Sequence, residues 1–203
     1  MRKIIRVGTV VTALFASTMD AHAAMAGYKA SDIIIRARAV QIQFHNHTNT
    51  AALSGVGADN KVIPEVDGAY FFTRNIAAEL ILTYPQTIYV HSGIGSLKAL
   101  PPTLTAQYHF MPDSPYFRPY VGVGVNYTRF FSYSLVSGLS GSRSSLGAAL
   151  QAGFDVPLTR SLTFNVDVKK VYMKTKITAP GGGSVGTLAL NPLLIGVGLG
   201  WKF

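Results

Sequence analysis

The stretch NPLLIGVGLGWKF, Asn191 to Phe203, closes the chain and decides its fold. Taken in steps of two, it places large apolar side chains on one face and mostly glycines on the other. The apolar set is Leu193, Ile195, Val197, Leu199, Trp201 and Phe203. Alternation with a period of two is typical of a β-strand with two unlike faces. Chain ends usually fray, so this ending indicates that the last residues pair with another strand.

The same alternation runs through most of the chain. TLTAQYHF at 103–110, PYVGVGVNYT at 119–128 and LGAALQAGFDV at 146–156 all show it. Eight such segments can be drawn, at 31–44, 61–72, 76–90, 100–110, 117–133, 145–156, 161–177 and 187–203. The connections between them are alternately long and short. Long loops on one side and tight turns on the other are typical of outer-membrane barrels.

Two of these segments change phase. In the first, the apolar face passes from Ala37 to Val40, and in the seventh it passes from Val168 to Val171. A β-bulge adds one residue to a strand and would produce such a change. Relaxed alternation near the rim of a barrel is the other explanation.

Composition favours a membrane protein. The chain is 48% hydrophobic and 13% charged, and that charged share is about half of what soluble domains carry. No apolar run reaches the roughly 18 residues that a transmembrane helix needs. A soluble sandwich would also alternate, but here one face carries large apolar residues and the other carries Gly, Thr, Gln, Asn and charges. We therefore predict an all-β fold: an eight-stranded antiparallel transmembrane β-barrel with short periplasmic turns and longer extracellular loops.

The N-terminus has the pattern of a cleavable secretory signal. MRKIIR is basic, VGTVVTALFAS is apolar, and AHA places small residues at Ala21 and Ala23. We expect residues 1–23 to be the signal peptide and residues 24–203 to form a single barrel domain. An anchor helix is less favoured because the apolar run is too short to span a membrane. Removal of residues 1–23 takes away Arg2, Lys3, Arg6 and Asp20, so the net charge falls from +9 to +7. For an exported basic chain, anionic outer-membrane lipid is a better partner than nucleic acid.

Two internal motifs carry a family resemblance. LPPTLTAQYHF at 100–110 and FRPYVGVGVNYTRFF at 117–131, followed by the aromatic-ended final strand, resemble the OmpW family of outer-membrane proteins. The resemblance runs from about residue 30 to residue 203. It implies an eight-stranded barrel with a narrow, partly apolar interior and the passage of small hydrophobic molecules across the Gram-negative outer membrane.

The polar faces of the strands supply a candidate lumen. We expect a charged floor made of Arg36, Arg38, Glu65, Asp67, Glu79, Asp167 and Lys169. Apolar inward positions would form a path for a small hydrophobic ligand, and these are Ile63, Phe71, Ile81 and Leu194. The alternative is that the charges pair with one another and plug the barrel.

Prolines mark a candidate weak line in the wall. Pro64, Pro85, Pro101 and Pro102 fall on the second to fourth segments, and proline has no N–H to give to a ladder. They form either a lateral seam or ordinary rim prolines. The hypothesis that follows is a channel or passive carrier for small hydrophobic molecules with a lateral exit. The alternative is a structural or adhesive barrel with a plugged lumen that acts through its loops.

The other candidate sites give weaker evidence of a function. His91-Ser92 has no placed acid partner, and His45 with His47 has no third metal ligand, so we expect no enzyme, no cofactor and no metal. The terminal aromatics Trp201 and Phe203 resemble the signal that outer-membrane assembly machinery recognises.

Six basic residues should gather at the outer rim, where lipopolysaccharide phosphates lie. These are Lys61, Lys98, Arg129, Arg143, Lys174 and Lys176.

Overall fold

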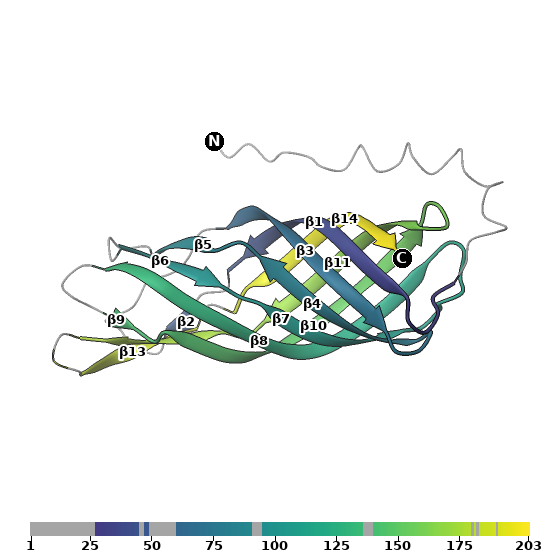
Figure 1. Ribbon diagram of the computed structural model, residues 1–203. Coiled ribbons are helices and arrows are strands. Elements are labelled where there is room, and N and C mark those ends of the chain that lie inside the picture. The colour runs from purple at the N-terminus through teal and green to yellow at the C-terminus, as the bar shows by residue number, and fades with distance from the viewer. Residues whose placement is uncertain are drawn as a thin grey trace.

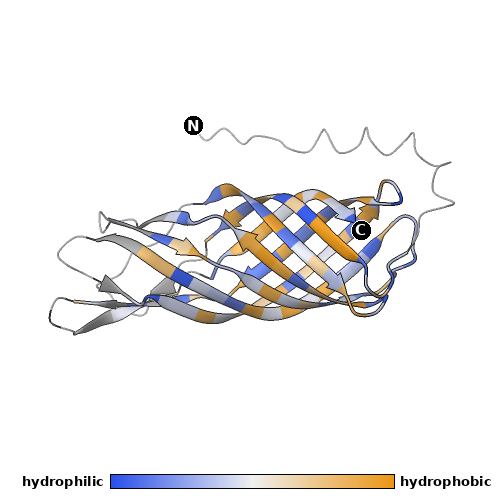
Figure 2. Cartoon of the chain, viewed as in Figure 1, coloured by the Kyte–Doolittle hydropathy of each residue, from blue (hydrophilic) through white to orange (hydrophobic). Residues whose placement is uncertain are grey.

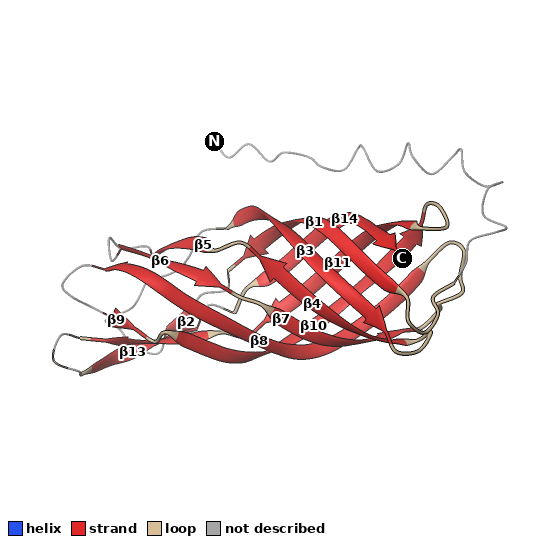
Figure 3. Ribbon diagram, viewed as in Figure 1, coloured by secondary structure: helices blue, strands red, loops and turns tan. Residues whose placement is uncertain are grey.

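The computed structural model describes residues 27–44, 47–48, 60–90, 95–135, 140–179, 181, 183–189 and 191–203. Its strands are β1 (Ile33–Gln43), β2 (His47–Thr48), β3 (Lys61–Phe71), β4 (Ile76–Thr83), β5 (Gln86–Val90), β6 (Gly95–Leu100), β7 (Thr103–His109), β8 (Arg118–Leu135), β9 (Ser140–Gly141), β10 (Ser144–Pro157), β11 (Leu162–Val171), β12 (Lys174–Thr178), β13 (Ser184–Ala189) and β14 (Leu193–Lys202). Within these ranges no helix is long and apolar enough to cross a membrane (Figure 3). The predicted signal peptide lies outside the described residues.

The strands close into a barrel with eight wall segments (Figure 1). Four segments are each built from two strands in line, namely β4 with β5, β7 with β6, β11 with β12, and β14 with β13. Every ladder is antiparallel, and β10 closes the ring by pairing with both β8 and β11. The last strand β14 pairs with the first strand β1, with Lys202 opposite Ile34. The predicted eight-stranded antiparallel barrel is confirmed.

The two ends of the barrel differ as predicted. Short turns at 72–75, 110–117 and 158–161 lie at the end where the chain terminates (Figure 1). The strands extend farther at the other end than the alternation indicated. The fourth segment starts at Gly95 instead of residue 100, and the eighth starts at Ser184 instead of residue 187. Ladder hydrogen bonds join β6 to β8 and β12 to β13 here, and such bonds do not require two unlike faces.

The outer wall is apolar. Val121, Val123 and Val125 on β8 are about half exposed in the isolated chain, whereas Asn126 on the same strand is fully buried. Hydrophobic and hydrophilic residues alternate along the strands (Figure 2). In β14 the glycines lie on the inner side, and a Cβ at Gly198 would overlap the carbonyl oxygen of Ala37 on β1. Those glycines therefore let the first and last strands approach closely at the closing seam.

The two predicted bulges are wrong. In β1 every second residue is buried from Ile34 to Ile42 without interruption, and the ladder to β14 keeps one register throughout. In β11 the register also runs unbroken past Lys169 and Lys170. What changes along these strands is the inner face, which passes from charged to apolar. The outer face changes in the opposite sense, from Ile33 and Ile35 to Gln41 in β1 and from Val168 to Lys170 in β11. The two faces therefore exchange polarity, and the sequence pattern imitates a change of phase.

Aromatic side chains form two outward bands, as expected at two membrane interfaces. The band near the short turns contains Tyr70, Phe72, Tyr108, Phe110, Tyr116, Phe117, Trp201 and Phe203, all exposed in the isolated chain. The band toward the long loops contains Tyr84, Tyr127 and Tyr172. These bands mark the limits of the lipid-facing wall, with the short turns on the periplasmic side.

Candidate functional site: the barrel interior

A buried ionic network fills the periplasmic half of the interior. Arg36 on β1 places Nη1 3.2 Å from Asp67 Oδ1 on β3, and Nη2 3.0 Å from Asp155 Oδ2 on β10. Both side chains of the Arg36–Asp67 pair are completely buried. The network therefore connects strands on opposite sides of the ring.

Arg38, one inward position along from Arg36, extends the network toward the loop side. Its Nη2 lies 2.6 Å from Glu79 Oε1, and its Nη1 lies 3.1 Å from Glu65 Oε1. Lys169 on β11 lies 3.3 Å from the same Glu65 oxygen and 3.6 Å from Asp167 Oδ1. All seven residues predicted for the charged floor are thus brought together by the fold. Buried ions are tolerated only when they are paired in this way.

Neutral side chains brace the carboxylates. Gln107 and Gln151 each donate an Nε2 hydrogen bond to Glu79 Oε2, at 2.9 and 2.8 Å. Gln151 Nε2 also lies 2.7 Å from Asp167 Oδ2, which accepts a 2.9 Å bond from the Tyr120 hydroxyl as well. Glu79 is the centre of this arrangement because both of its oxygens face donors.

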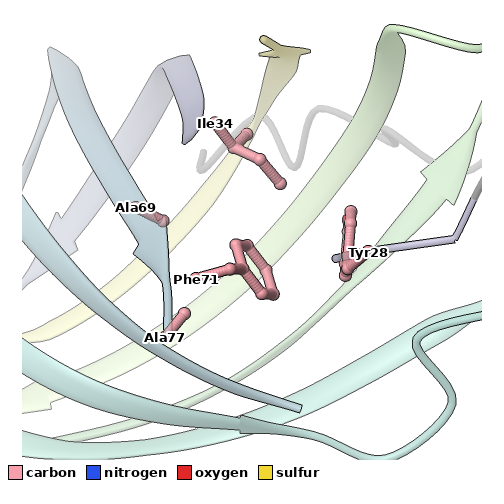
Figure 4. Close-up of a cluster of buried hydrophobic side chains, with 5 residues drawn as sticks. All are labelled: Tyr28, Ile34, Ala69, Phe71 and Ala77. Atoms are coloured by element: carbon pink, nitrogen blue, oxygen red, sulfur yellow. The ribbon is translucent and has the colours of Figure 1, made fainter. Parts of the chain in front are cut away.

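The segment before β1 seals the periplasmic end of the interior, which the alternation did not reveal. The Tyr28 side chain is 1% exposed, and its ring lies 4.6 Å from the Phe71 ring, centroid to centroid (Figure 4). The Arg118 guanidinium carbon lies over the Tyr28 ring at 4.6 Å. Lys202 Nζ, on the last strand, donates to the Gly27 carbonyl at 3.1 Å. The N-terminal segment is therefore held inside the barrel mouth by the closing strand.

Above the network, toward the long loops, the interior becomes an apolar cavity. Its empty space is about 550 Å³, counting the part that opens to solvent. Glu65 and Lys169 form the polar part of its lining nearest the network. The apolar wall contains Ile42, Phe44, Ile63, Ile81, Val171, Met173 and Leu194. The wall suits an apolar guest, and the charged residues stop the cavity from continuing through the barrel.

Three of the four residues predicted for the ligand path line the cavity, and one does not. Ile63, Ile81 and Leu194 line the cavity. Phe71 does not, because it packs with Tyr28 and Ile34 on the periplasmic side of the charges (Figure 4). Strand direction explains the difference, since Phe71 is the last residue of β3 at the short-turn end. Ile42, Val171 and Met173 were missed as lining residues because their phase was attributed to bulges.

The wall has an unpaired stretch beside the cavity. The ladder between β3 and β4 ends at the pair Glu65–Thr83, and β5 pairs with β6 but has no ladder to β3. Pro64 and Pro85 are exposed on the two sides of this gap. Lys61 Nζ bridges the gap by donating to the Thr87 carbonyl at 2.9 Å. We call the stretch between residues 61–64 and 86–90 the β3–β5 gap.

The other two prolines of the predicted seam, Pro101 and Pro102, lie on the next wall segment, away from the β3–β5 gap. Pro101 and Pro102 separate β6 from β7, on the other side of the β4–β5 segment. Asn126 Nδ2 donates to both of their carbonyls, at 3.3 and 3.2 Å. Pro101 lines the cavity, but the two prolines are tied to β8 and do not border the β3–β5 gap.

The remaining candidates are on the periphery. Trp201 and Phe203 lie on the outward face at the periplasmic end. His45, His91 and Ser92 are outside the described residues, and of His47 the structure describes only the backbone pairing with Ala189. Within the described ranges no three or more His, Asp or Glu side chains are grouped so that they could hold a metal ion.

Comparison with known proteins agrees with this geometry. A family model described as OmpW family matches residues 29–203. An outer-membrane protein of Sinorhizobium fredii, uncharacterized and designated y4mB, is 38% identical over 188 residues, covering 88% of this chain and 82% of the relative. The crystal structure of OprG from Pseudomonas aeruginosa superposes with a TM-score of 0.73 at 28% identity, covering 89% of this chain and 99% of that one. The solution structure of Escherichia coli outer membrane protein W gives 0.66 at 29% identity, covering 87% and 100%.

Proposed function

Because this chain belongs to the OmpW family of outer-membrane proteins, we propose that it is an outer-membrane channel or passive carrier for small hydrophobic molecules, which enter from the long-loop side and leave sideways into the membrane. The observation that carries the proposal is the apolar cavity that ends on a buried ionic network. A hydrophobic guest gains by leaving water for this cavity and meets a charged barrier at its base.

The barrier argues against a straight path through the barrel. Arg36, Arg38 and their carboxylate partners are fully buried and link β1 to β3, β4 and β10. Tyr28 fills the space on the periplasmic side of them. To pass along the axis, a hydrophobic guest would have to separate paired ions in a medium of low dielectric, which costs several kcal/mol for each ion.

The β3–β5 gap supplies the sideways route in this proposal. Backbone groups that face lipid without partners are costly. Pro64 and Pro85, at the edges of this gap, have no N–H that would need a partner there. Ile63 and Gln86, which flank the gap, also line the cavity, so the proposed exit is next to the bound guest.

The second candidate is a structural or adhesive barrel that acts through its loops. The plugged periplasmic half supports it, since a sealed floor needs no cargo. The apolar lining above the floor favours the carrier, because a barrel that serves only as a scaffold gains nothing from an apolar cavity open to solvent. Neither candidate requires a catalytic residue.

The carrier proposal is tested by uptake of a hydrophobic fluorescent dye into cells with the protein, without it, or with an Ile81→Arg variant. Ile81 is 2% exposed and lines the cavity, so arginine there introduces a charge and fills the space. We expect Ile81→Arg to lower the initial uptake rate to that of cells lacking the protein.

The matched control is Ile81→Val, which keeps an apolar β-branched side chain and should keep most of the uptake. Surface amount is checked for each variant by protease accessibility of the loops in whole cells. Equal uptake with and without the protein would overturn the carrier and leave the structural barrel as the better account.

A further inference from the structure

Positive charge is concentrated on one sector of the outer rim. Arg129 on β8, Arg143 just before β10, and Lys174 and Lys176 on β12 are all exposed. Lys98 on β6 is exposed as well. Successive neighbours in the ring are β6, β8, β10 and then the β11–β12 segment. We call these five side chains the basic sector.

Ladder contacts bring the members of the basic sector side by side. Arg129 lies opposite Ser144 on β10, and Lys98 lies opposite Phe131, two residues farther along β8. The Lys174 amide donates to Ser145 Oγ at 3.0 Å, and the Ser142 amide donates to the Lys176 carbonyl at 3.1 Å. Arg143 therefore lies just before β10, between the arginine of β8 and the lysines of β12.

An exposed apolar platform lies directly below the basic sector, on β8, on β10 and between β11 and β12. Tyr127, Leu146 and Tyr172 are 50%, 75% and 39% exposed. Tyr127 is opposite Leu146, and the Tyr172 amide donates to the Ala148 carbonyl at 2.9 Å. Arg129 and Lys174 each follow one of these tyrosines by two residues, which is about 7 Å along a strand and about 5 Å along the membrane normal at 45° tilt.

No carboxylate that the structure describes neutralises the basic sector. Of the acidic residues within the described ranges, Asp32 and Asp113 lie near the periplasmic turns, where Asp113 pairs with Arg74 at 2.8 Å. The other five are Glu65, Asp67, Glu79, Asp155 and Asp167, all buried in the ionic network. The charge that complements this sector must therefore come from outside the described part of the chain.

We propose that the basic sector and its platform bind a phosphorylated glycolipid of the outer leaflet, the lipid A part of lipopolysaccharide. Its phosphates would accept charge-assisted hydrogen bonds from Arg129 and Lys174, with Arg143 adding positive charge nearby. Its acyl chains would pack on Tyr127, Leu146 and Tyr172, where tyrosines at a membrane interface place an apolar ring in the chain region and a hydroxyl in the headgroup region. This lipid site lies on the outer wall and does not depend on the cavity.

Native mass spectrometry of the full-length protein in detergent tests the site, with bisphosphorylated lipid A, phosphate-free lipid A or inorganic phosphate as the probe. The wild type should retain bisphosphorylated lipid A. The Arg129→Gln/Lys174→Gln variant should bind it about tenfold more weakly, because two phosphate contacts are lost. The matched control is Lys29→Gln/Arg160→Gln, which removes two exposed cations at the periplasmic end and should bind as the wild type does.

Three outcomes would overturn the proposal. The first is equal binding of phosphate-free lipid A, which would make the contact an apolar one only. The second is inorganic phosphate competing as well at the same concentration, which would make the sector a general anion site. The third is unchanged binding by the Arg129→Gln/Lys174→Gln variant while the heat-dependent gel shift shows that the barrel is folded.

Discussion

The Tyr28 hydroxyl donates a 2.7 Å hydrogen bond to Asp155 Oδ2, joining the N-terminal segment to a strand 127 residues away. Burial raises the pKa of the Tyr28 phenol well above its ordinary value, and the nearby Asp155 carboxylate raises it further. The phenol therefore stays protonated and remains a donor. Asp155 also binds Arg36 at 3.0 Å, so one carboxylate connects the periplasmic seal to the ionic network.

Tyr28→Phe removes this hydrogen bond and keeps the ring. A buried hydrogen bond to a charged group contributes about 1.5–3 kcal/mol, and we expect the free energy of unfolding to fall by about that amount. Urea unfolding in detergent, followed by the fluorescence of the single tryptophan Trp201, measures it. The control Tyr108→Phe alters an outward-facing tyrosine and should change the stability by less than about 0.5 kcal/mol.

The centre of the ionic network gives a second prediction, for Glu79→Gln. Glu79 Oε1 faces the guanidinium groups of Arg38 and Arg36, and Oε2 faces Gln107 and Gln151. A glutamine removes the negative charge that both guanidinium groups face. Its NH₂ group would meet the nitrogen donors of these two arginines and two glutamines, with the Thr105 hydroxyl, at 3.2 Å from Oε2, as an available acceptor. Breaking a buried pair on one side costs about 3–5 kcal/mol, and we expect a loss of that size in the same unfolding assay.

The matched control for Glu79→Gln is Asp113→Asn. Asp113 pairs with Arg74 at 2.8 Å, but both side chains are more than half exposed. An exposed pair contributes about 0–1 kcal/mol, so this variant should unfold close to the wild type. Equal losses for the two variants would mean that burial does not strengthen the network.

The sequence was sufficient for the barrel and for the membership of its charged floor. Alternation along β14 identified the wall strands, and all seven predicted floor residues meet in the structure. These predictions succeeded because a two-residue period assigns each side chain to a face directly. The same rule failed where the two faces exchange polarity, so that Val40 and Ile42 were attributed to a bulge although β1 runs without one.

Alternation does not predict the contacts of segments outside the strands. It also does not predict the position of a residue along the barrel axis. Tyr28 precedes the first strand and has no periodic neighbours, so nothing in its local pattern placed it in the interior. Phe71 was assigned to the correct face but to the wrong level, because the sequence does not show where the charges of other strands lie relative to it. The β3–β5 gap was indicated by its prolines, whereas the ties of Pro101 and Pro102 to Asn126 depend on a third strand.

Restoring the N–H groups at the β3–β5 gap should close it. In a Pro64→Val/Pro85→Val variant both strands regain a donor, and β-branched residues favour pairing. We expect amide hydrogen exchange at 62–63 and 86–88 to slow by about tenfold, the equivalent of about 1.4 kcal/mol or one hydrogen bond. Dye uptake should fall in parallel if the gap is the exit.

The control for the gap is Pro119→Val, which changes a proline at the periplasmic end of β8, where the ladder to β10 is continuous. It should leave uptake and exchange at the gap unchanged. If exchange slows in the Pro64→Val/Pro85→Val variant while dye uptake stays at the wild-type level, the gap is not the exit route.

The last residue, Phe203, helps to close the barrel through its backbone, whereas its aromatic side chain faces outward. The Phe203 amide donates to the Ile33 carbonyl at 2.8 Å, and the Ile33 amide donates back at 3.3 Å. The Phe203 side chain is 73% exposed, so it contributes little to the interior. We propose that this ring, with Trp201, is read by the outer-membrane assembly machinery. Deleting Phe203 should then lower the amount of protein in the outer membrane more than it lowers dye uptake per assembled molecule.

Substitutions at Phe203 separate the ring from the backbone. Phe203→Ala keeps both hydrogen bonds to Ile33 and should assemble as poorly as the deletion, whereas Phe203→Tyr keeps an aromatic ring and should assemble normally. Surface protein is quantified by loop proteolysis in whole cells, and refolding of the purified variants into detergent serves as the control for intrinsic foldability. If Phe203→Ala reaches the wild-type surface level while the deletion does not, the backbone closure matters and the ring is not a signal.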